Sequence, residues 1–209
     1  MSEPVTFRLG VTQAQIARAT RIYCEAFADK LSPFLGSVDR MVEPLSSALV
    51  ADRAVVAMRG GEVVGVVGFK VRGRGLFEPT FWQFTKAYGW SGPFRLLGLS
   101  FLDRPERPGE LLLDGLAVAA DARGQGLGTG LLKAIEAHAA RLGKVSVGLD
   151  VVDTNPRARE LYERLGFTAT KTTDIGAMRM VFPFRSVTRM TKPVDAQAAA
   201  SLHGAITPL

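Results

Sequence analysis

The pattern of apolar and polar positions predicts that the chain begins with a strand, two helices and a hairpin. Residues 5–9 alternate between apolar and polar side chains, as a half-buried strand does. Residues 12–27 and 38–51 each carry apolar side chains at helical spacing. Two valine-rich runs, 54–58 and 63–69, predict strands, and the glycine pair between them allows the tight turn of a hairpin.

The middle of the chain predicts a strand, a helix and a second strand. The apolar run 111–118 is too short for a buried helix, and its one glycine, Gly115, predicts a β-bulge or a close approach of the backbone. Residues 126–142 place apolar side chains on one helical face, and residues 145–152 predict the next strand. Because a helix connects these two strands, we expect them to be parallel.

The C-terminal part predicts a short helix and two antiparallel strands. Asn155 and Pro156 are favoured at the start of a helix, and Gly166 is favoured just after its end. A strand from 167 to about 173 and a closing strand over 185–192 follow. The apolar segment between them contains glycine and proline, and it fits either a loop over a site or additional core.

Residues 72–110 separate the hairpin from the central strand and are rich in aromatic side chains. The pattern predicts one or two short helices, interrupted near residues 89–93. Three interpretations stay open: an additional layer or dimer interface, a lid or wall that shapes a pocket, and a helix that rests on lipid. The segment holds eight of the chain's 17 aromatic residues, namely Phe77, Phe81, Trp82, Phe84, Tyr88, Trp90, Phe94 and Phe101.

Composition narrows the class of protein. A length of 209 residues and an apolar fraction of 47% predict one globular domain over 1–194, followed by a flexible tail over 195–209. The net charge of +6 comes from scattered basic residues, so we expect no nucleic acid partner. No signal peptide opens the chain and no run of 18 apolar residues occurs, so we expect a cytoplasmic protein without a transmembrane segment.

The cysteine and the histidines do not predict a nucleophile or a metal site. Cys24 is the one cysteine, and we expect it to be a packing residue of the first helix. His138 and His203 are the two histidines, and no metal-ligand spacing links them. We expect His138 at the surface of its helix.

A glycine-rich turn follows the central strand and leads into the next helix. Such a turn collects free backbone N–H groups at the positive end of a helix, which favours a phosphate there. A P-loop is excluded because Gly128 is followed by Thr129 and Gly130 rather than by Lys and Ser or Thr. The dinucleotide fingerprint is excluded because its last glycine is absent, whether counted from Gly124 or from Gly126.

Two motifs resemble the signatures of the GNAT N-acetyltransferase superfamily. Arg123, Gly126 and Gly128 match the spacing Arg-x-x-Gly-x-Gly of its acyl-CoA loop, directly behind a buried strand. Residues 155–167 match its second signature, Asn-x-x-Ala-x-x-Leu-Tyr-x-x-x-Gly-Phe, almost residue for residue. The two motifs lie within 111–167, and looser agreement extends from residue 4 to about 193.

The resemblance implies a fold and a ligand. The fold is the α/β GNAT fold, a strongly twisted mixed sheet of about seven strands with helices on both faces, here with 72–110 as a mostly helical insertion before the central strand. The ligand is acetyl-CoA, whose pyrophosphate would bind the glycine-rich turn and whose pantetheine arm would pair with the central strand. The residues expected to contact it are Leu116, Ala117, Val118, Arg123, Gly124, Gln125, Gly126, Leu127, Gly128, Thr129, Asn155 and Ala158.

The resemblance also implies catalytic roles. Tyr162 occupies the position from which the family's tyrosine points at the CoA sulfur as an acid, and the alternative is that it packs between helix and sheet. Asp114, beside the expected bulge, and Asp150, on the neighbouring strand, both fit the general base, directly or through a water. A backbone N–H near residues 116–118 is expected to bind the developing oxyanion.

These features predict an enzyme, an acyl-CoA-dependent N-acetyltransferase that acetylates a primary amine by direct attack in a ternary complex. A small-molecule amine is the expected acceptor, because the insertion and residues 174–184 can enclose a pocket. A protein or peptide N-terminus is the alternative, and it predicts an open groove. A CoA-binding sensor without turnover is a further alternative, and a homodimer is compatible with each.

Overall fold

A computed structural model describes residues 3–100, 103–195 and 206–207, and it contains one mixed sheet. The sheet is antiparallel except where β4 pairs with β5 and β1 with β8. Its strands lie in the order β6-β7-β5-β4-β3-β2-β1-β8. They are β1 (Thr6–Leu9), β2 (Ala54–Arg59), β3 (Glu62–Lys70), β4 (Glu110–Val118), β5 (Ser146–Val152), β6 (Thr168–Asp174), β7 (Ser186–Pro193) and β8 (Ile206–Thr207).

Seven of these strands were predicted from the sequence, and β8 was not. The parallel pairing of β4 with β5 and the antiparallel pairing of β6 with β7 are confirmed. The short strand β8 lies within the predicted flexible tail and pairs with β1. Most of that tail, 196–205 and 208–209, lies outside the described residues.

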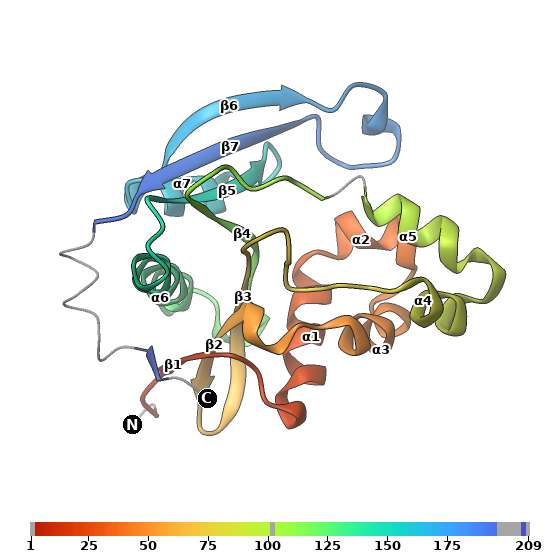
Figure 1. The fold of residues 1–209 in the computed structure, drawn as a ribbon, viewed down its shortest axis with the longest axis horizontal. Helices are drawn as coiled ribbons and strands as arrows, with labels where there is room; N and C mark the ends of the chain where they lie inside the picture. Colours follow the sequence, from red (N-terminus) through yellow and green to blue (C-terminus); the bar gives the residue numbers. More distant parts are fainter. Residues whose placement is uncertain (1–2, 101–102, 196–205, 208–209) are drawn as a thin grey trace.

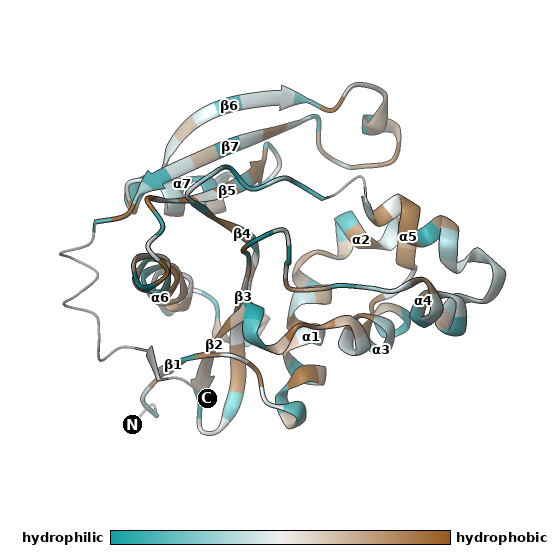
Figure 2. Ribbon diagram, in the orientation of Figure 1, coloured by the Kyte–Doolittle hydropathy of each residue, from teal (hydrophilic) through white to brown (hydrophobic). Residues whose placement is uncertain are grey.

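Helices cover both faces of the sheet (Figure 1). Helix α6 crosses one face over β1 to β5, and α1 packs on β3 and β4 from the other face. Figure 2 shows that apolar segments of β2, β3 and β4 lie between these two helices. The helices are α1 (Gln13–Ala26), α2 (Ala28–Leu35), α3 (Val38–Ala48), α4 (Phe81–Tyr88), α5 (Gly92–Ser100), α6 (Leu127–Arg141) and α7 (Pro156–Arg164), with short 3₁₀ turns at Ala51–Arg53, Gly89–Ser91, Ala120–Ala122 and Gly176–Met180.

Helix α2 was missed by the sequence analysis, which left residues 28–37 without an element. A single residue, Phe27, separates it from α1, because the backbone bends there. It contains Pro33, which cannot donate a helical hydrogen bond and usually indicates that no helix is present. The helix ends two residues later at Leu35, before Gly36 with φ +85°. The proline therefore lies in its last turn.

The predicted bulge in the central strand is confirmed. Leu116 faces Val67 and Leu113 faces Phe69, so two residues of β4, 114 and 115, lie opposite Gly68 of β3 alone. Gly115 has φ +102°, a conformation that other residues rarely adopt. The bulge changes the direction in which the neighbouring Asp114 side chain leaves the strand.

The aromatic insertion forms an additional helical layer. Helices α4 and α5 pack against α2 and α3, and together they enclose a second apolar core. Cys24 belongs to this core as a packing residue, and burial raises the pKa of its thiol to about 12. The buried members of the core are Cys24, Leu31, Leu35, Met41, Leu45, Phe84 and Tyr88.

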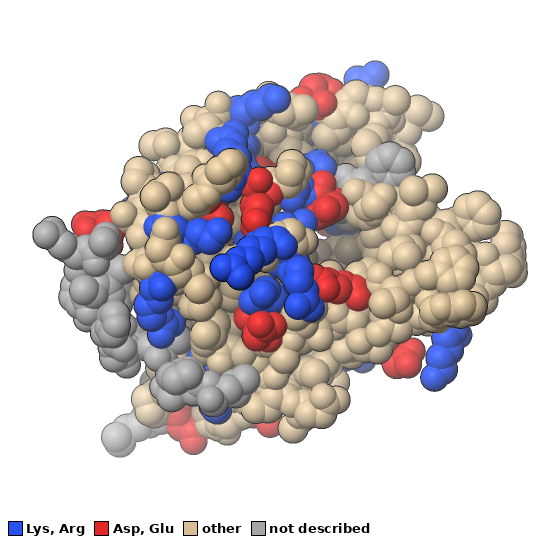
Figure 3. Space-filling model, viewed as in Figure 1, with Lys and Arg blue, Asp and Glu red and all other residues tan. Residues whose placement is uncertain are grey.

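The outer surface of this layer is largely uncharged. Figure 3 shows acidic and basic side chains mixed over the middle of the viewed face, and few of them at the end formed by α4 and α5. Trp82 and Trp90 are 78% and 86% exposed there, and Phe94 is 68% exposed. Among the described residues, no helix combines the length and apolar character that crossing a membrane requires.

The predicted surface position of His138 is wrong. Its side chain is buried on the sheet-facing side of α6, near Leu131 and Ile135, with its ring 4.9 Å from the Phe69 ring. Burial lowers the pKa of His138 to about 4, so the imidazole is neutral at pH 7. The apolar face of this helix is wider than the sequence pattern predicted.

We predict that Phe84→Ala lowers the free energy of unfolding by about 3–5 kcal/mol, because it leaves a cavity in the second core. Phe81→Ala on the same helix is the control, and it should cost about 1 kcal/mol or less because Phe81 is 50% exposed. Urea denaturation measures both. Equal costs for the two variants would mean that α4 does not pack as described.

Candidate active site

The site begins where the two central parallel strands part. Strands β4 and β5 pair only at Glu110, Leu111 and Leu112 of β4. Beyond this point β4 keeps its pairing with β3 over Leu116–Val118, and no described strand pairs with its other edge. A cavity of about 120 Å³ lies in this gap, lined by β4, β5, α7 and two residues of the α1–α2 segment. An extended ligand with amide groups can pair with such a strand edge.

A cradle of backbone N–H groups follows β4. None of the N–H groups of residues 124–129 donates a hydrogen bond to another described residue. Gly124 and Gly126 have φ +76° and +77°, and no atom lies within 4 Å of the position that a Cβ would take on either. These donors surround the N-terminus of α6, so the residues present fit a bound diphosphate. Arg59 of β2 donates a hydrogen bond to the side-chain oxygen of Gln125. The sequence analysis did not identify Arg59.

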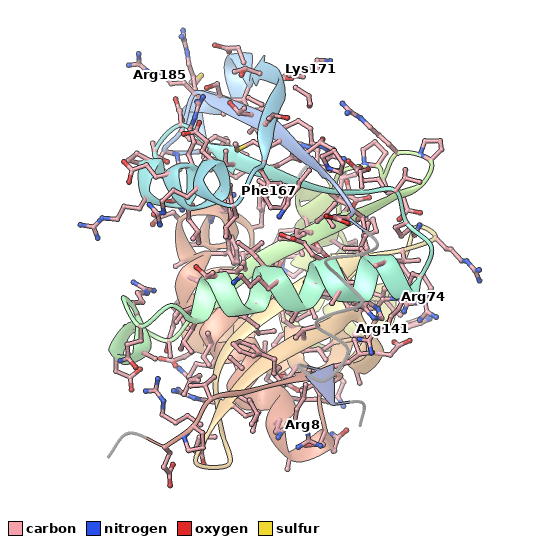
Figure 4. The ribbon with its side chains drawn as sticks, turned by 90° about the vertical axis from the view of Figure 1, so that its left-hand side faces the viewer. Arg8, Arg74, Arg141, Phe167, Lys171 and Arg185 are labelled. Carbon is pink, nitrogen blue, oxygen red and sulfur yellow. The ribbon has the colours of Figure 1, made fainter. Side chains whose placement is uncertain are left out.

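Helix α7 places Tyr162 in the gap between the strands. The Asn155 side chain caps the helix by accepting a hydrogen bond from the N–H of Ala158 at 3.1 Å, and Pro156 occupies the first turn, as predicted. Tyr162 lies in the C-terminal half of the same helix, and its side chain is 9% exposed. Its ring packs edge-on against Phe167, which lies close to α7 and β6 (Figure 4).

The hydroxyl of Tyr162 keeps its proton at neutral pH. Burial raises the pKa of this phenol to about 12. Its oxygen makes no hydrogen bond with the described residues, and the side chain lines the small cavity. The side chain thus packs between helix and sheet and also borders the gap, so the two interpretations from the sequence are compatible.

A larger cavity of about 470 Å³ adjoins the gap. Strand β4 forms one wall, α1 and α2 a second, residues 73–79 with α5 a third, and Phe184 closes another side. The insertion therefore forms a wall of this cavity as well as a layer of the fold. The two cavities share the lining residues Phe27, Lys30, Leu113, Gly115, Asp150 and Val152.

Asp114 lines the larger cavity beside the bulge. Its Oδ2 accepts a hydrogen bond from the N–H of Leu76 at 2.8 Å, and its carbonyl oxygen accepts one from the Tyr23 hydroxyl at 3.0 Å. Burial raises the pKa of the Asp114 carboxyl, while the Leu76 N–H and the nearby Lys70 act in the opposite direction. Asp114 makes no ion pair with the described residues.

Asp150 lines both cavities, but its charge is engaged elsewhere. Its Oδ2 lies 3.3 Å from Arg189 and 3.9 Å from Arg104. Arg189 also binds the buried Glu110 at 2.6 Å. The Asp150 carboxylate is therefore already engaged in ion pairs, whereas Asp114 is not.

Lys30 is a charged cavity residue that the sequence analysis missed. It extends from α2 into the junction of the two cavities, with its Nζ 5.5 Å from the Phe27 ring centre and 5.7 Å from that of Phe184. No motif contains it, and the helix that carries it was not predicted. Only the folded arrangement of α2 beside β4 identifies it.

The other predicted coenzyme contacts divide into two groups. Leu116 lines the small cavity, and Val118 lies at the start of the turn, where its carbonyl oxygen accepts a hydrogen bond from Arg123 at 3.2 Å. Ala117 and Leu127 have buried side chains in the main core. Those two residues can therefore offer a ligand their backbone but not their side chains. Within the described residues, no group of His, Cys, Asp and Glu is arranged to hold a metal ion.

Solved structures with a similar fold are acetyltransferases. The ribosomal-protein-S18-alanine N-acetyltransferase from Escherichia coli has a TM-score of 0.57 and 16% identity, covering 92% of this chain and 95% of that one. An N-acetyltransferase from Staphylococcus aureus Mu50 has a TM-score of 0.60 and 13% identity, covering 92% and 99%. The yncA protein from Salmonella typhimurium, solved with its cofactor acetyl-CoA, has a TM-score of 0.58 and 19% identity, covering 91% and 94%. At these identities the likeness shows the fold.

The sequence itself carries the assignment to a family. It matches the acetyltransferase (GNAT) family over residues 21–167, more than half of the chain, while no curated protein matches it significantly. The matched range contains both motifs, the parted strands and the cradle at α6. This chain belongs to the GNAT family of acetyltransferases, which use acetyl-CoA as the acyl donor.

Proposed function

We propose that this chain is an N-acetyltransferase that acetylates a primary amine of a small molecule by direct attack in a ternary complex. The observation that carries the proposal is the junction of the two cavities beside Gly115 and Asp150. Tyr162 lines the cavity in the gap between the strands, and Asp114 lines the cavity next to it. A proton donor and a proton acceptor thus lie on opposite sides of one junction, as acyl transfer to an amine requires.

When bound, acetyl-CoA supplies the activated acetyl group, and the chain holds it at three places. The N–H groups of residues 124–129 bind its pyrophosphate, supported by the dipole of α6. The free edge of β4 at Leu116–Val118 offers backbone groups to its pantetheine arm. Asn155 uses its side-chain oxygen for the helix cap, which leaves its amide nitrogen available for the same arm.

Asp114 is the general base of this proposal. An amine acceptor arrives mostly protonated and must lose a proton to become a nucleophile. A carboxylate whose pKa is raised by burial holds that proton more strongly than an exposed one does. Asp150 differs in its contacts, because Arg104 and Arg189 already bind its carboxylate. We therefore assign Asp150 an electrostatic role at the junction.

Tyr162 stabilises the departing sulfur. A phenol with a pKa of about 12 is a weaker acid than an ordinary thiol, whose pKa is about 8.5, so full proton transfer to a thiolate would be uphill. A hydrogen bond from its hydroxyl to the developing negative charge is favourable in a buried site. The proton that Asp114 removes from the amine can complete the neutralisation.

The walls of the larger cavity support a small acceptor over a peptide. A peptide N-terminus would need an open groove, whereas residues 73–79, α5 and Phe184 occupy the sides of this cavity.

We place the reaction in the cytoplasm, where a chain with a single buried thiol is compatible with reducing conditions. A homodimer, if one forms, would use the exposed aromatic side chains of α4 and α5.

We predict that Gly126→Glu lowers the affinity for acetyl-CoA by about a hundredfold or more, because a carboxylate would lie beside the pyrophosphate and like charges in contact cost several kcal/mol. Gly143→Glu is the matched control, since Gly143 also has positive φ and open space around it but lies at the other end of α6. Titration calorimetry with acetyl-CoA and with CoA measures both. Unchanged affinity in Gly126→Glu would show that the pyrophosphate binds elsewhere.

Tyr162→Phe should lower kcat on the order of a hundredfold and leave acetyl-CoA affinity unchanged, because it removes one donor and keeps the packing against Phe167. Thiol release on mixing with amines measures kcat, and calorimetry measures affinity. A CoA-binding sensor would bind acetyl-CoA equally well in both forms and release no thiol in either.

The two aspartates can be separated by their pH profiles. In the native enzyme, kcat/KM should fall as the pH is lowered through the raised pKa of Asp114, because only the ionised carboxylate accepts a proton. Asp114→Asn keeps the Leu76 hydrogen bond, should lower kcat on the order of a hundredfold, and should remove this acidic limb. Asp150→Asn should retain the limb. Loss of the limb in Asp150→Asn alone would identify Asp150 as the base.

A further inference from the structure

The larger cavity contains one cation that the protein does not neutralise. Lys30 makes no ion pair and no hydrogen bond with the described residues, although Asp150 and Arg104 act on it at longer range. Its Nζ lies beside the rings of Phe27 and Phe184. Burial lowers the pKa of its ammonium group, and an anion bound beside it would raise that pKa again.

The other charged side chains of the cavity are paired, with one exception. Lys70 is bound to Asp103, and Glu78 to Arg74. Asp150 is held by Arg104 and Arg189, as described above. The exception is Asp114, which accepts a backbone hydrogen bond but has no cationic partner among the described residues. The lining therefore offers a ligand one unpaired negative charge and one unpaired positive charge.

Apolar side chains form much of the rest of the cavity lining. The rings of Tyr23 and Phe27 lie 4.5 Å apart, and the Phe77 ring lies 4.9 Å from that of Tyr23. Leu96 and Leu99 of α5 line the opposite wall. A volume of about 470 Å³ is within the range typical of sites for small molecules.

We propose that the acceptor is an amino acid or a closely related amine that carries a carboxylate and an apolar side chain. This proposal rests on the proposed N-acetyltransferase function. The amino group lies toward Asp114, the carboxylate binds Lys30 at the junction of the two cavities, and the apolar side chain packs against Tyr23, Phe77 and the leucines of α5. The reaction forms the amide C–N bond and breaks the thioester C–S bond. Of the two protons that the ammonium group loses, one passes through Asp114 to the departing thiolate and the other is released to solvent.

The first test compares amines that differ only in the carboxylate. The two pairs are L-phenylalanine with 2-phenylethylamine and L-leucine with 3-methylbutylamine. In the native enzyme, kcat/KM should be higher for the amino acid of at least one pair by roughly 10- to 100-fold, the range expected for a hydrogen bond between charged groups. No preference in either pair would overturn the proposal.

Lys30→Met assigns the preference to a residue. It removes the charge and keeps a side chain of similar length beside Phe27, so the preference should collapse to about twofold or less, mainly through KM, while Lys30→Arg should retain most of it. Lys171→Met is the control, because Lys171 is exposed on the edge strand β6 (Figure 4) and should leave the preference unchanged. Equal loss of activity toward both members of a pair would mean that Lys30 acts on the acyl donor instead, and would overturn the proposal.

A binding experiment separates this proposal from the proposed function. With CoA in place of acetyl-CoA no acetyl group can be transferred, and calorimetry can compare the same pairs. A carboxylate preference that is lost in Lys30→Met would support the binding site even if no amine were acetylated, a result that would overturn only the N-acetyltransferase function. Acetylation of amines with no carboxylate preference in binding or turnover would overturn only the inference made here.

Discussion

The parting of β4 and β5 is the constraint on which the site depends. The two strands pair at three positions and then separate, so the middle of the sheet contains an unpaired backbone edge. Backbone groups inside a protein cost free energy when they find no partner. Helix α7 fills part of the gap with Leu161 and Tyr162, and the remaining space is the small cavity. A ligand with amide groups can satisfy the edge that the fold leaves open.

The two ends of the parted strands are held in different ways. At the paired end, Arg189 of β7 binds Glu110 of β4 and Asp150 of β5, and so ties three strands together. Glu110 is 1% exposed and lies against Gly148, where a larger residue would collide with its carboxylate. At the other end, the rings of Tyr23 and Phe27 pack against Gly115 instead. The sheet is thus joined by buried charges where it is closed and shaped by aromatic packing where it opens.

The local parts of this arrangement could be predicted from the sequence. The strand, turn and helix around Gly126 and the capped helix from Asn155 to Tyr162 depend on neighbouring residues, and the structure has each of them in place. Gly115 predicted the bulge because few other residues adopt its backbone conformation. The parallel pairing of β4 with β5 followed from the helix between them. These features account for the donor side of the site.

The acceptor side could not be predicted, because it is assembled from distant segments. Lys30 comes from a helix with a proline in its last turn, and no periodic pattern revealed that helix. The burial of His138 depends on how far α6 turns toward Phe69, which a narrow apolar face did not indicate. The proposal of Asp114 rather than Asp150 as general base depends on Arg189, which lies 39 positions beyond Asp150. Tertiary contacts, rather than residue types, distinguish the two carboxylates.

This division has a physical consequence for specificity. In the proposed site the motifs position the acyl donor through the backbone, so their geometry is set by glycine conformations and by the ends of helices. The proposed acceptor cavity is lined by side chains of α2, α5 and residues 73–79, which pack on one another in the second core. A change in that core can move Lys30 or Leu99 without disturbing the cradle at α6. Acceptor choice can therefore vary within one fold while the cradle stays constant, because no residue of the cradle belongs to the second core.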